Sequence, residues 1–256
     1  FAEEVSKREK VIYLDCELSD MQIKSRYTSE DGKIYQFPEN LLRVEIDVFA
    51  DLPQGMNEEE YLIKSLEDAI VSTGTKIVIV DNLTWLRNDT EKAKDALGLM
   101  KKLQKIKKRY DITMIVLAHS PKRDETRPIT INDLSGSMML ANSCDAMTAV
   151  GKCSTDPQMR YLKQLKSRYD PITYSTENVM LYQLERRADG FTGFTSLGYG
   201  NELDYLKPST ILDKKERDEQ IMVLHRLGKT DREIAKELNI STMTVWRIIK
   251  KKDVML

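Results

Sequence analysis

The stretch that decides the fold is Lys76-Ile77-Val78-Ile79-Val80-Asp81, in which four successive apolar residues end at an acid. A short, unbroken apolar run of this kind is typical of a strand buried on both faces, as in a parallel sheet. Residues 11–14 and 113–118 have the same character, and residues 42–49 alternate weakly. These segments are predicted to be strands of one sheet.

Helical segments separate these strands. Asn57 and the three glutamates after it are an N-terminal capping pattern, and Gly74 ends the segment. Thr90 is predicted to cap a second helix, whose apolar stripe runs from Ala93 to Ile106 and whose lysines lie on a solvated face. Because strands and helices alternate, we expect an α/β fold with a largely parallel sheet flanked by helices on both faces. Later strands at 146–150, 161–166 and 179–184 are expected to add an antiparallel flank.

The charge is unevenly spread along the 256 residues, whose formal net charge is −1. Residues 207–256 carry 12 Lys and Arg against 8 Asp and Glu, and the rest of the chain carries 28 against 33. A basic tail on a mildly acidic body is typical of an added nucleic-acid module. The pattern also becomes purely helical near Pro208, so we predict two domains, 1–206 and 207–256.

The second domain carries a pattern of two short helices at residues 228–249. Thr230 and Glu233 form a capping box, Asn239 suits the turn, and Ser241 caps the next helix. This is the form of a helix-turn-helix, whose second helix reads the major groove of DNA. A plain helical bundle, or a domain that binds a protein partner, is the alternative.

The second of these helices turns Val245, Ile248 and Ile249 inward. Trp246 either reads a base edge or folds back into the core of the domain. The residues expected to contact DNA here are Thr242, Met243, Thr244, Trp246, Arg247, Lys250 and Lys251.

Composition excludes several other classes of protein. The three cysteines lack metal-ligand spacing and are expected to be core thiols in a reducing compartment, the cytoplasm. Two histidines exclude a histidine-rich metal site. No apolar run approaches the ~20 residues of a membrane span, so no membrane partner is expected.

Polar side chains follow three of the predicted strands, where ligands bind in an open parallel sheet. Asp81 resembles an acid that holds Mg²⁺, Glu17 can polarise an attacking water, and His119 can donate a hydrogen bond to a phosphate. The plain alternatives are a strand-ending acid, a surface acid and a capping histidine. Lys166 and Arg168 end a later strand and can reach into a neighbouring subunit, unless they form only an exposed cationic turn.

Together these features resemble the RecA-like ATPases, especially the hexameric replicative-helicase branch (DnaB-like and RepA-like). The resemblance covers residues 1 to about 185 and keeps the family's order. It rests on Tyr13-Leu14-Asp15-Cys16-Glu17-Leu18-Ser19, the strand at 77–81, Leu117-Ala118-His119-Ser120-Pro121-Lys122, the helix start at 134–137 with Asp145, and Lys166-Ser167-Arg168.

The resemblance implies a role for each candidate residue. Glu17 is the catalytic base, Asp81 binds the metal, His119 is the sensor, and Lys166 with Arg168 are fingers toward a neighbour. ATP and Mg²⁺ are the implied cofactors, DNA and further copies of the chain in a hexameric ring or filament are the implied partners, and DNA replication is the implied process. In the loop 120–134, Lys122, Arg123 and Arg127 suit contact with DNA in a central channel.

The sequence departs from the family at its phosphate-binding loop, because G-x-x-x-x-G-K-[ST] is absent. Gly151-Lys152-Cys153-Ser154 lacks the hydroxyl residue after the lysine, and Gly228-Lys229-Thr230 matches only the ending of the motif. The family places that loop just before a helix whose end residues 1–5 are predicted to form, so the chain is expected to be a fragment that lacks the first strand and is inactive alone. The alternative is a non-enzymatic, oligomeric DNA-binding regulator.

Overall fold

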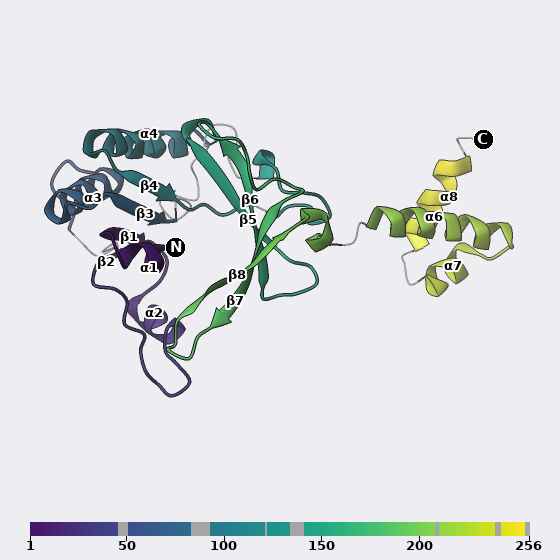
Figure 1. Cartoon of the computed structure of the whole chain (residues 1–256). Helices are drawn as coiled ribbons and strands as arrows, with labels where there is room; N and C mark the ends of the chain where they lie inside the picture. Colours follow the sequence, from purple (N-terminus) through teal and green to yellow (C-terminus); the bar gives the residue numbers. More distant parts are fainter. Residues whose placement is uncertain are drawn as a thin grey trace. The chain divides into compact units, whose positions relative to one another are not determined.

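A parallel sheet organises the N-terminal half of the chain in the computed structural model, which describes residues 1–45, 51–82, 93–120, 122–133, 141–207, 210–238 and 242–253. Its strands are β1 (Val11–Asp15), β2 (Leu41–Glu45), β3 (Ile77–Asp81) and β4 (Thr113–Val116), in the order β2-β1-β3-β4 (Figure 1). The predicted α/β class is confirmed. Residues 46–49, predicted to continue the second strand, lie outside the described residues.

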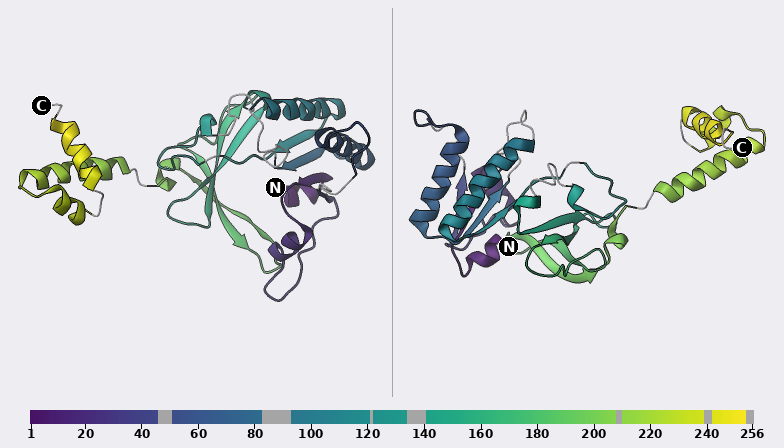
Figure 2. Two further views of the ribbon diagram at one scale, coloured as in Figure 1. Left: turned by 180° about the vertical axis from the view of Figure 1, so that it is seen from behind. Right: turned by 90° about the horizontal axis from the view of Figure 1, so that it is seen from above.

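Two helices cover one face of this sheet, α3 (Glu58–Thr73) and α4 (Ala93–Tyr110), as Figure 2 shows. Asn57 caps α3 in a reciprocal capping box with Glu60, and Gly74 ends it in the left-handed conformation at φ 66°, as predicted. Burial of alternate strand residues under the apolar stripes of both helices makes the main core. That core includes Ile12, Leu14, Leu66, Ile70, Val78, Val80, Leu99, Met100, Leu103 and Ile106.

Two short N-terminal helices complete this part of the fold. Helix α1 (Ala2–Ser6) contacts β1 and β2, in line with the helical pattern of residues 1–5. Helix α2 (Asp20–Arg26) was not predicted, although Ser19 and Gln22 form a capping box at its start. It has no buried residue, so the apolar periodicity that identifies longer helices is absent.

The predicted antiparallel flank is a second sheet, in the order β5-β6-β7-β8. Its strands are β5 (Ala146–Lys152), β6 (Met159–Ser167), β7 (Val179–Arg186) and β8 (Thr192–Gly200) (Figure 1). Strand β8 was missed because three glycines interrupt its pattern. One of them, Gly200, lies so close to Tyr205 that an added Cβ would come within 2.5 Å of the phenol oxygen.

A buried ion pair fixes the loop that enters this second sheet. Glu202, at the start of the 3₁₀ helix η2 (Glu202–Tyr205), is fully buried and lies 2.6 Å from the Nζ of Lys163 on β6. The other oxygen of Glu202 accepts from the backbone N–H of Ile129 at 2.7 Å, and Lys163 donates to the Ile129 carbonyl at 2.8 Å. Residues 129–133, which include the 3₁₀ helix η1 (Ile131–Asp133), are thereby tied to β6.

The chain divides into two compact units, one of Phe1–Asp124 with Pro128–Tyr205 and one of Glu125–Arg127 with Leu206–Leu256. The second contains α6 (Thr210–Arg226), α7 (Asp231–Glu237) and α8 (Thr242–Asp253). These helices pack around a small core of Ile221, Ile234, Ala235, Val245 and Ile249. No helix in the described ranges is long and apolar enough to cross a membrane.

The predicted capping box of the second unit is present at the start of α7. Thr230 and Glu233 form a capping box at the start of α7, and Gly228 takes a left-handed conformation at φ 82° after α6. Asn239 and Ser241, the predicted turn and cap before α8, lie outside the described residues.

Candidate functional site

The carboxyl ends of three adjacent strands meet at one edge of the parallel sheet. Asp15 of β1 lies in register with Asp81 of β3, and the backbone N–H of Cys16 donates to the Asp81 carbonyl at 2.7 Å. Beyond β4, the N–H of Leu117 donates to the Val80 carbonyl at 2.9 Å. This pairing brings together the residues that follow each strand, although they are far apart in sequence.

Glu17 and His119, two of the predicted site residues, are in contact at this edge. The Glu17 Oε1 atom lies 3.2 Å from the Nε2 of His119, and the two side chains are 43% and 67% exposed. A carboxylate and an imidazole at this distance can share a hydrogen bond, while their exposure leaves them open to a ligand.

A third side chain, Asn82, joins this contact and was not predicted. Its amide nitrogen donates to Glu17 Oε1 and lies 3.1 Å from His119 Nε2, although the residue is only 1% exposed. A buried amide has few rotamers available, so it holds the two more exposed side chains in a defined place. Its position directly after Asp81 was the only signal in the sequence.

The carboxylate of Asp81 is bonded to Tyr13, a residue of the matching stretch to which the sequence assigned no role. The Tyr13 hydroxyl donates to Asp81 Oδ2, and within the described residues Oδ1 accepts no hydrogen bond. Burial, followed by the hydrogen bond to Asp81, raises the pKa of Tyr13, so the phenol remains a donor. Asp81 is thus oriented by one oxygen while the other remains available.

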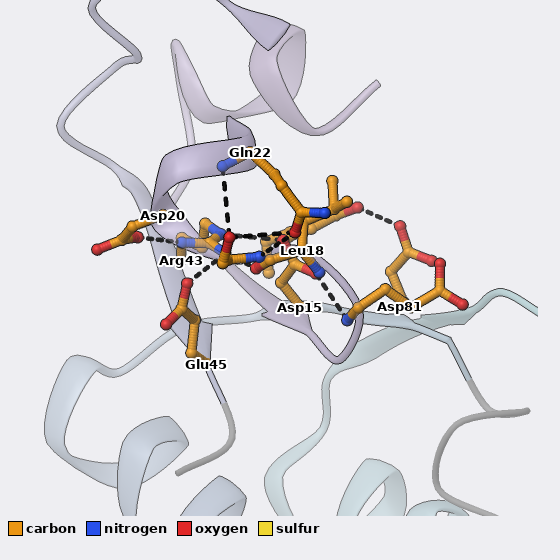
Figure 3. A network of polar contacts seen from close by, with 10 residues as sticks. Asp15, Leu18, Asp20, Gln22, Arg43, Glu45 and Asp81 are labelled. Carbon is orange, nitrogen blue, oxygen red and sulfur yellow. Dashed lines mark hydrogen bonds and ion pairs between the residues drawn. The ribbon is translucent and has the colours of Figure 1, made fainter. Parts of the chain in front are cut away.

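An arginine network fixes the turn that carries Glu17 (Figure 3). Asp15, almost fully buried, accepts from the N–H groups of Glu17 at 3.1 Å and Leu18 at 2.9 Å, and from Arg43 Nε at 3.0 Å. Arg43 also pairs with Asp20 and Glu45, each at 2.5 Å, and donates to the Leu18 carbonyl. The backbone of the turn at residues 17–18 is therefore held by Asp15 of β1 and by Arg43 of β2.

The donor set at this edge suits a magnesium ion shared with phosphate better than an all-protein metal cage. Among the described residues no group of three or more His, Cys, Asp or Glu side chains is placed to hold a metal ion. Asp81 offers one carboxylate oxygen, and Mg²⁺ is commonly bound by one or two carboxylates together with phosphate oxygens and water. The residues present therefore fit that ion.

Lys166 and Arg168 contact a different part of the chain, the segment 141–145. Lys166 Nζ donates to the Ala141 carbonyl. Arg168 donates to the Asn142 carbonyl at 2.7 Å and to Asp145 Oδ1 at 3.2 Å. Lys107, which the sequence placed on a solvated face, also pairs with Asp145. The hydrogen bond from Lys107, with the charges of both cations, lowers the pKa of Asp145. The helix start predicted at 134–137 lies outside the described residues.

The cations predicted to face DNA in the loop 120–134 are distributed over both units. Lys122 and Arg127 are exposed and Arg123 is half-buried, with a hydrogen bond from its guanidinium to the Asp124 carbonyl at 3.1 Å. Arg127 groups with the C-terminal unit, whereas Lys122 and Arg123 belong to the first. The structure therefore does not gather the three into one patch of a single unit.

Helix α8 presents the outward face that the sequence predicts. Thr242, Met243 and Arg247 are exposed, and Thr244 is half-buried. Trp246 is 49% exposed with Lys250 Nζ 4.6 Å from its ring centre, so the interpretation that Trp246 folds back into the core is wrong. The side chain of Lys251 lies outside the described residues.

Family models match both parts of the chain. Residues 2–125 match a family described as AAA domain, and residues 213–252 match one described as homeodomain-like domain. No curated protein matches the chain.

Two of the solved structures that share the fold illustrate the match. One is a DnaB-like replicative helicase studied with primase, at 13% identity and a TM-score of 0.54, where the match covers 73% of this chain and 51% of that one. The other is a KaiC-like protein from the hyperthermophilic archaeon Pyrococcus horikoshii OT3, at 10% identity and a TM-score of 0.53, covering 76% and 80%. The chain spans about half the length of the helicase. The first unit has a RecA-like fold, followed by a domain of the helix-turn-helix type.

Proposed function

We propose that the chain is part of a DNA-associated ATPase of the RecA-like replicative-helicase type, which hydrolyses ATP between subunits of a ring or filament. The observation that carries this proposal is the contact of Glu17, Asn82 and His119 beside Asp81 at the carboxyl edge of the sheet. Acidic and imidazole groups at this edge suit the binding and hydrolysis of a phosphoanhydride.

Each residue has a stated role in this proposal. Glu17 accepts the proton of the attacking water, and its half-exposed position admits that water. Asp81 would hold Mg²⁺ by Oδ1, with Tyr13 orienting the carboxylate through Oδ2. Mg²⁺, when bound, supplies charge that stabilises the phosphate oxygens. His119 donates to the terminal phosphate, and its contact with Glu17 links that phosphate to the base.

The remaining roles fall to the neighbouring subunit and to DNA. Lys166 and Arg168 would stabilise phosphoryl charge in the next copy of the chain. The domain at 207–256, with its exposed α8 face, would bind duplex DNA, and the match of residues 213–252 to a homeodomain-like model supports this. Lys122, Arg123 and Arg127 would add contacts to the DNA backbone.

The chain on its own is expected to bind ATP weakly. Its 256 residues contain no G-x-x-x-x-G-K-[ST], so the backbone nest and lysine that cradle phosphates are absent from them. Calorimetric titration of the chain with Mg-ATP tests this, and micromolar affinity would contradict it.

The function itself is tested by ATP turnover of the protein expressed from its complete gene, with and without DNA. Glu17→Gln and Arg168→Ala should each abolish turnover while nucleotide binding persists, and Glu9→Gln, a change of the same kind at an exposed site, should leave it intact. Turnover unchanged by Glu17→Gln would remove the assignment of the base.

The alternative is a non-enzymatic, oligomeric DNA-binding regulator, which the absence of the phosphate-loop sequence favours. It predicts DNA binding and self-association with no ATP turnover in the unchanged protein. The same assay therefore separates the two functions.

A further inference from the structure

Three cationic side chains from separate parts of the chain contact the segment 141–145 in the first unit. Lys107 comes from the last turn of α4, Lys166 from the end of β6, and Arg168 lies two residues further on. Lys107 and Arg168 contact opposite oxygens of Asp145, Oδ2 and Oδ1. The family resemblance assigns no role to Lys107.

Helix α4 builds the frame of this cluster independently of Arg168. Gln104, one turn before Lys107, donates to the Ser143 carbonyl at 2.5 Å, so the same face of α4 holds the segment 141–145 at two points. The backbone N–H of Arg168 donates to the Asp145 carbonyl at 3.0 Å, which ties the end of β6 to that segment. The three cations are thus kept near one another by the fold.

The ionic contacts themselves are of the kind that a ligand displaces easily. Arg168 reaches Asp145 through a single nitrogen at 3.2 Å, and the two side chains are 45% and 33% exposed. Lys107 is 41% exposed. Exposed, single-contact ion pairs contribute little to stability, whereas a phosphate can take two parallel hydrogen bonds from one guanidinium.

Charge also favours an anion at this place. Asp145 pairs with two cations, Lys107 and Arg168, and Lys166 contacts the Ala141 carbonyl of the same segment, so the cluster keeps an excess of positive charge with Asp145 ionised. A phosphate group would use the cations that Asp145 now occupies.

We propose that Lys107, Lys166 and Arg168 form one polyphosphate-binding site, in which Asp145 is an internal counter-ion that phosphate replaces. This rests on the proposed function, since the ligand there is the terminal phosphate of the nucleotide bound by a neighbouring copy. It adds Lys107 to the group that stabilises the transferred phosphoryl charge and makes Asp145 a competitor that holds this group when no neighbour is present.

The test is calorimetric titration of the chain as it stands with inorganic tripolyphosphate. Lys107→Ala should weaken binding about tenfold, the loss of one charge-assisted contact. Lys108→Ala, the same charge change at the next, exposed position, should leave affinity within about twofold. Asp145→Asn should strengthen binding, because it removes the competing carboxylate.

Equal losses for Lys107→Ala and Lys108→Ala would overturn the site, since that pattern indicates general charge screening. Weaker binding by Asp145→Asn would overturn the competition. Arg168→Lys keeps the charge but loses the two parallel N–H donors of the guanidinium, so it should still weaken binding. Thermal unfolding followed by circular dichroism identifies any variant that fails to fold. A short single-stranded DNA replaces tripolyphosphate in a second arm, and a larger Lys107→Ala effect on DNA would overturn the assignment to a nucleotide phosphate.

These titrations need no ATP turnover, so they separate the site from the proposed function. Loss of turnover by Glu17→Gln with no effect of Lys107→Ala on tripolyphosphate would leave the ATPase standing and remove Lys107 from it.

Discussion

The amide nitrogen of Asn82 lies 3.1 Å from Nε2 of His119 and also donates to Glu17, so one buried side chain bridges residues that follow β1 and β4. Glu17 and His119 are much more exposed than Asn82. The defined geometry of the pair therefore depends on Asn82.

Asn82→Ala should change the environment of His119 without unfolding the chain. The protein has two histidines, His119 in the first unit and His225 in the second, so ring resonances in nuclear magnetic resonance spectra resolve both. We expect the ring signals of His119 to move and those of His225 to stay, because Asn82 contacts His119 and His225 belongs to the other unit. Unmoved His119 signals would show that the contact does not persist in solution.

Glu202→Ala should destabilise the first unit by about 3–5 kcal/mol, because it leaves the buried Lys163 ammonium without its partner. It also removes the acceptor for the Ile129 N–H. The matched control is Glu177→Ala, at an exposed glutamate that accepts a hydrogen bond from Ser175. Urea unfolding of Glu202→Ala, Glu177→Ala and the unchanged chain measures the loss of unfolding free energy in each variant. A loss no larger than that of the control would mean that the pair is hydrated in solution.

Helices and strands were predicted correctly where burial of apolar side chains or helix capping alone determines the local sequence pattern. Unbroken apolar runs identified β1 and β3, and reciprocal caps identified α3 and α7. Helix α2 and strand β8 were missed because the first buries no side chain and the second is interrupted by glycine.

The candidate site shows the same division. The predicted ends of the strands indicated that Glu17, Asp81 and His119 lie at one edge of the sheet, because parallel strands end at a common edge. The orienting residues Tyr13, Arg43 and Asn82 were missed, since each acts through a partner that only the sheet register brings near. Lys107 was predicted to lie on a solvated helix face for the same reason, because its partner Asp145 follows much later in the chain.

Cys16 should react slowly with iodoacetamide in the native chain. Burial, followed by the nearby charges of Asp15 and Asp81, raises the pKa of its thiol to about 12 from 9.0. The native rate should keep rising about tenfold per pH unit up to pH 9.5, where an ordinary thiol levels off. Mass spectrometry of the Cys16 peptide measures it, and an early plateau would contradict the shift.

The same pKa shift has a defined effect on stability. A thiol whose pKa is raised by folding stabilises the native state fully below pH 9 and less as pH rises toward 12. Cys16→Ala should therefore flatten the loss of stability over that alkaline range, measured by urea midpoints. An unchanged slope would assign the alkaline loss to other groups.

Thr230→Ala should destabilise the C-terminal domain by about 1 kcal/mol, since it removes the side-chain oxygen that accepts from the Glu233 N–H. Thr230→Ser keeps that oxygen and should preserve most of the stability. Thermal unfolding followed by circular dichroism compares the two, and equal losses would show that the threonine methyl group, not the cap, is responsible.

Trp246 and Lys250 should contribute to DNA binding in different ways. The ring and the ammonium lie together on exposed α8, so Trp246→Ala removes a contact surface and the platform that positions Lys250. Lys250→Ala should reduce the slope of log affinity against log salt by about 1, because one phosphate contact is lost. Fluorescence anisotropy with labelled duplex DNA at several salt concentrations measures both.

Arg226→Ala, which removes an exposed cation at the end of α6, should leave the slope unchanged. If it lowers the slope as much as Lys250→Ala, binding depends on the overall charge of the domain and α8 is not the reading helix.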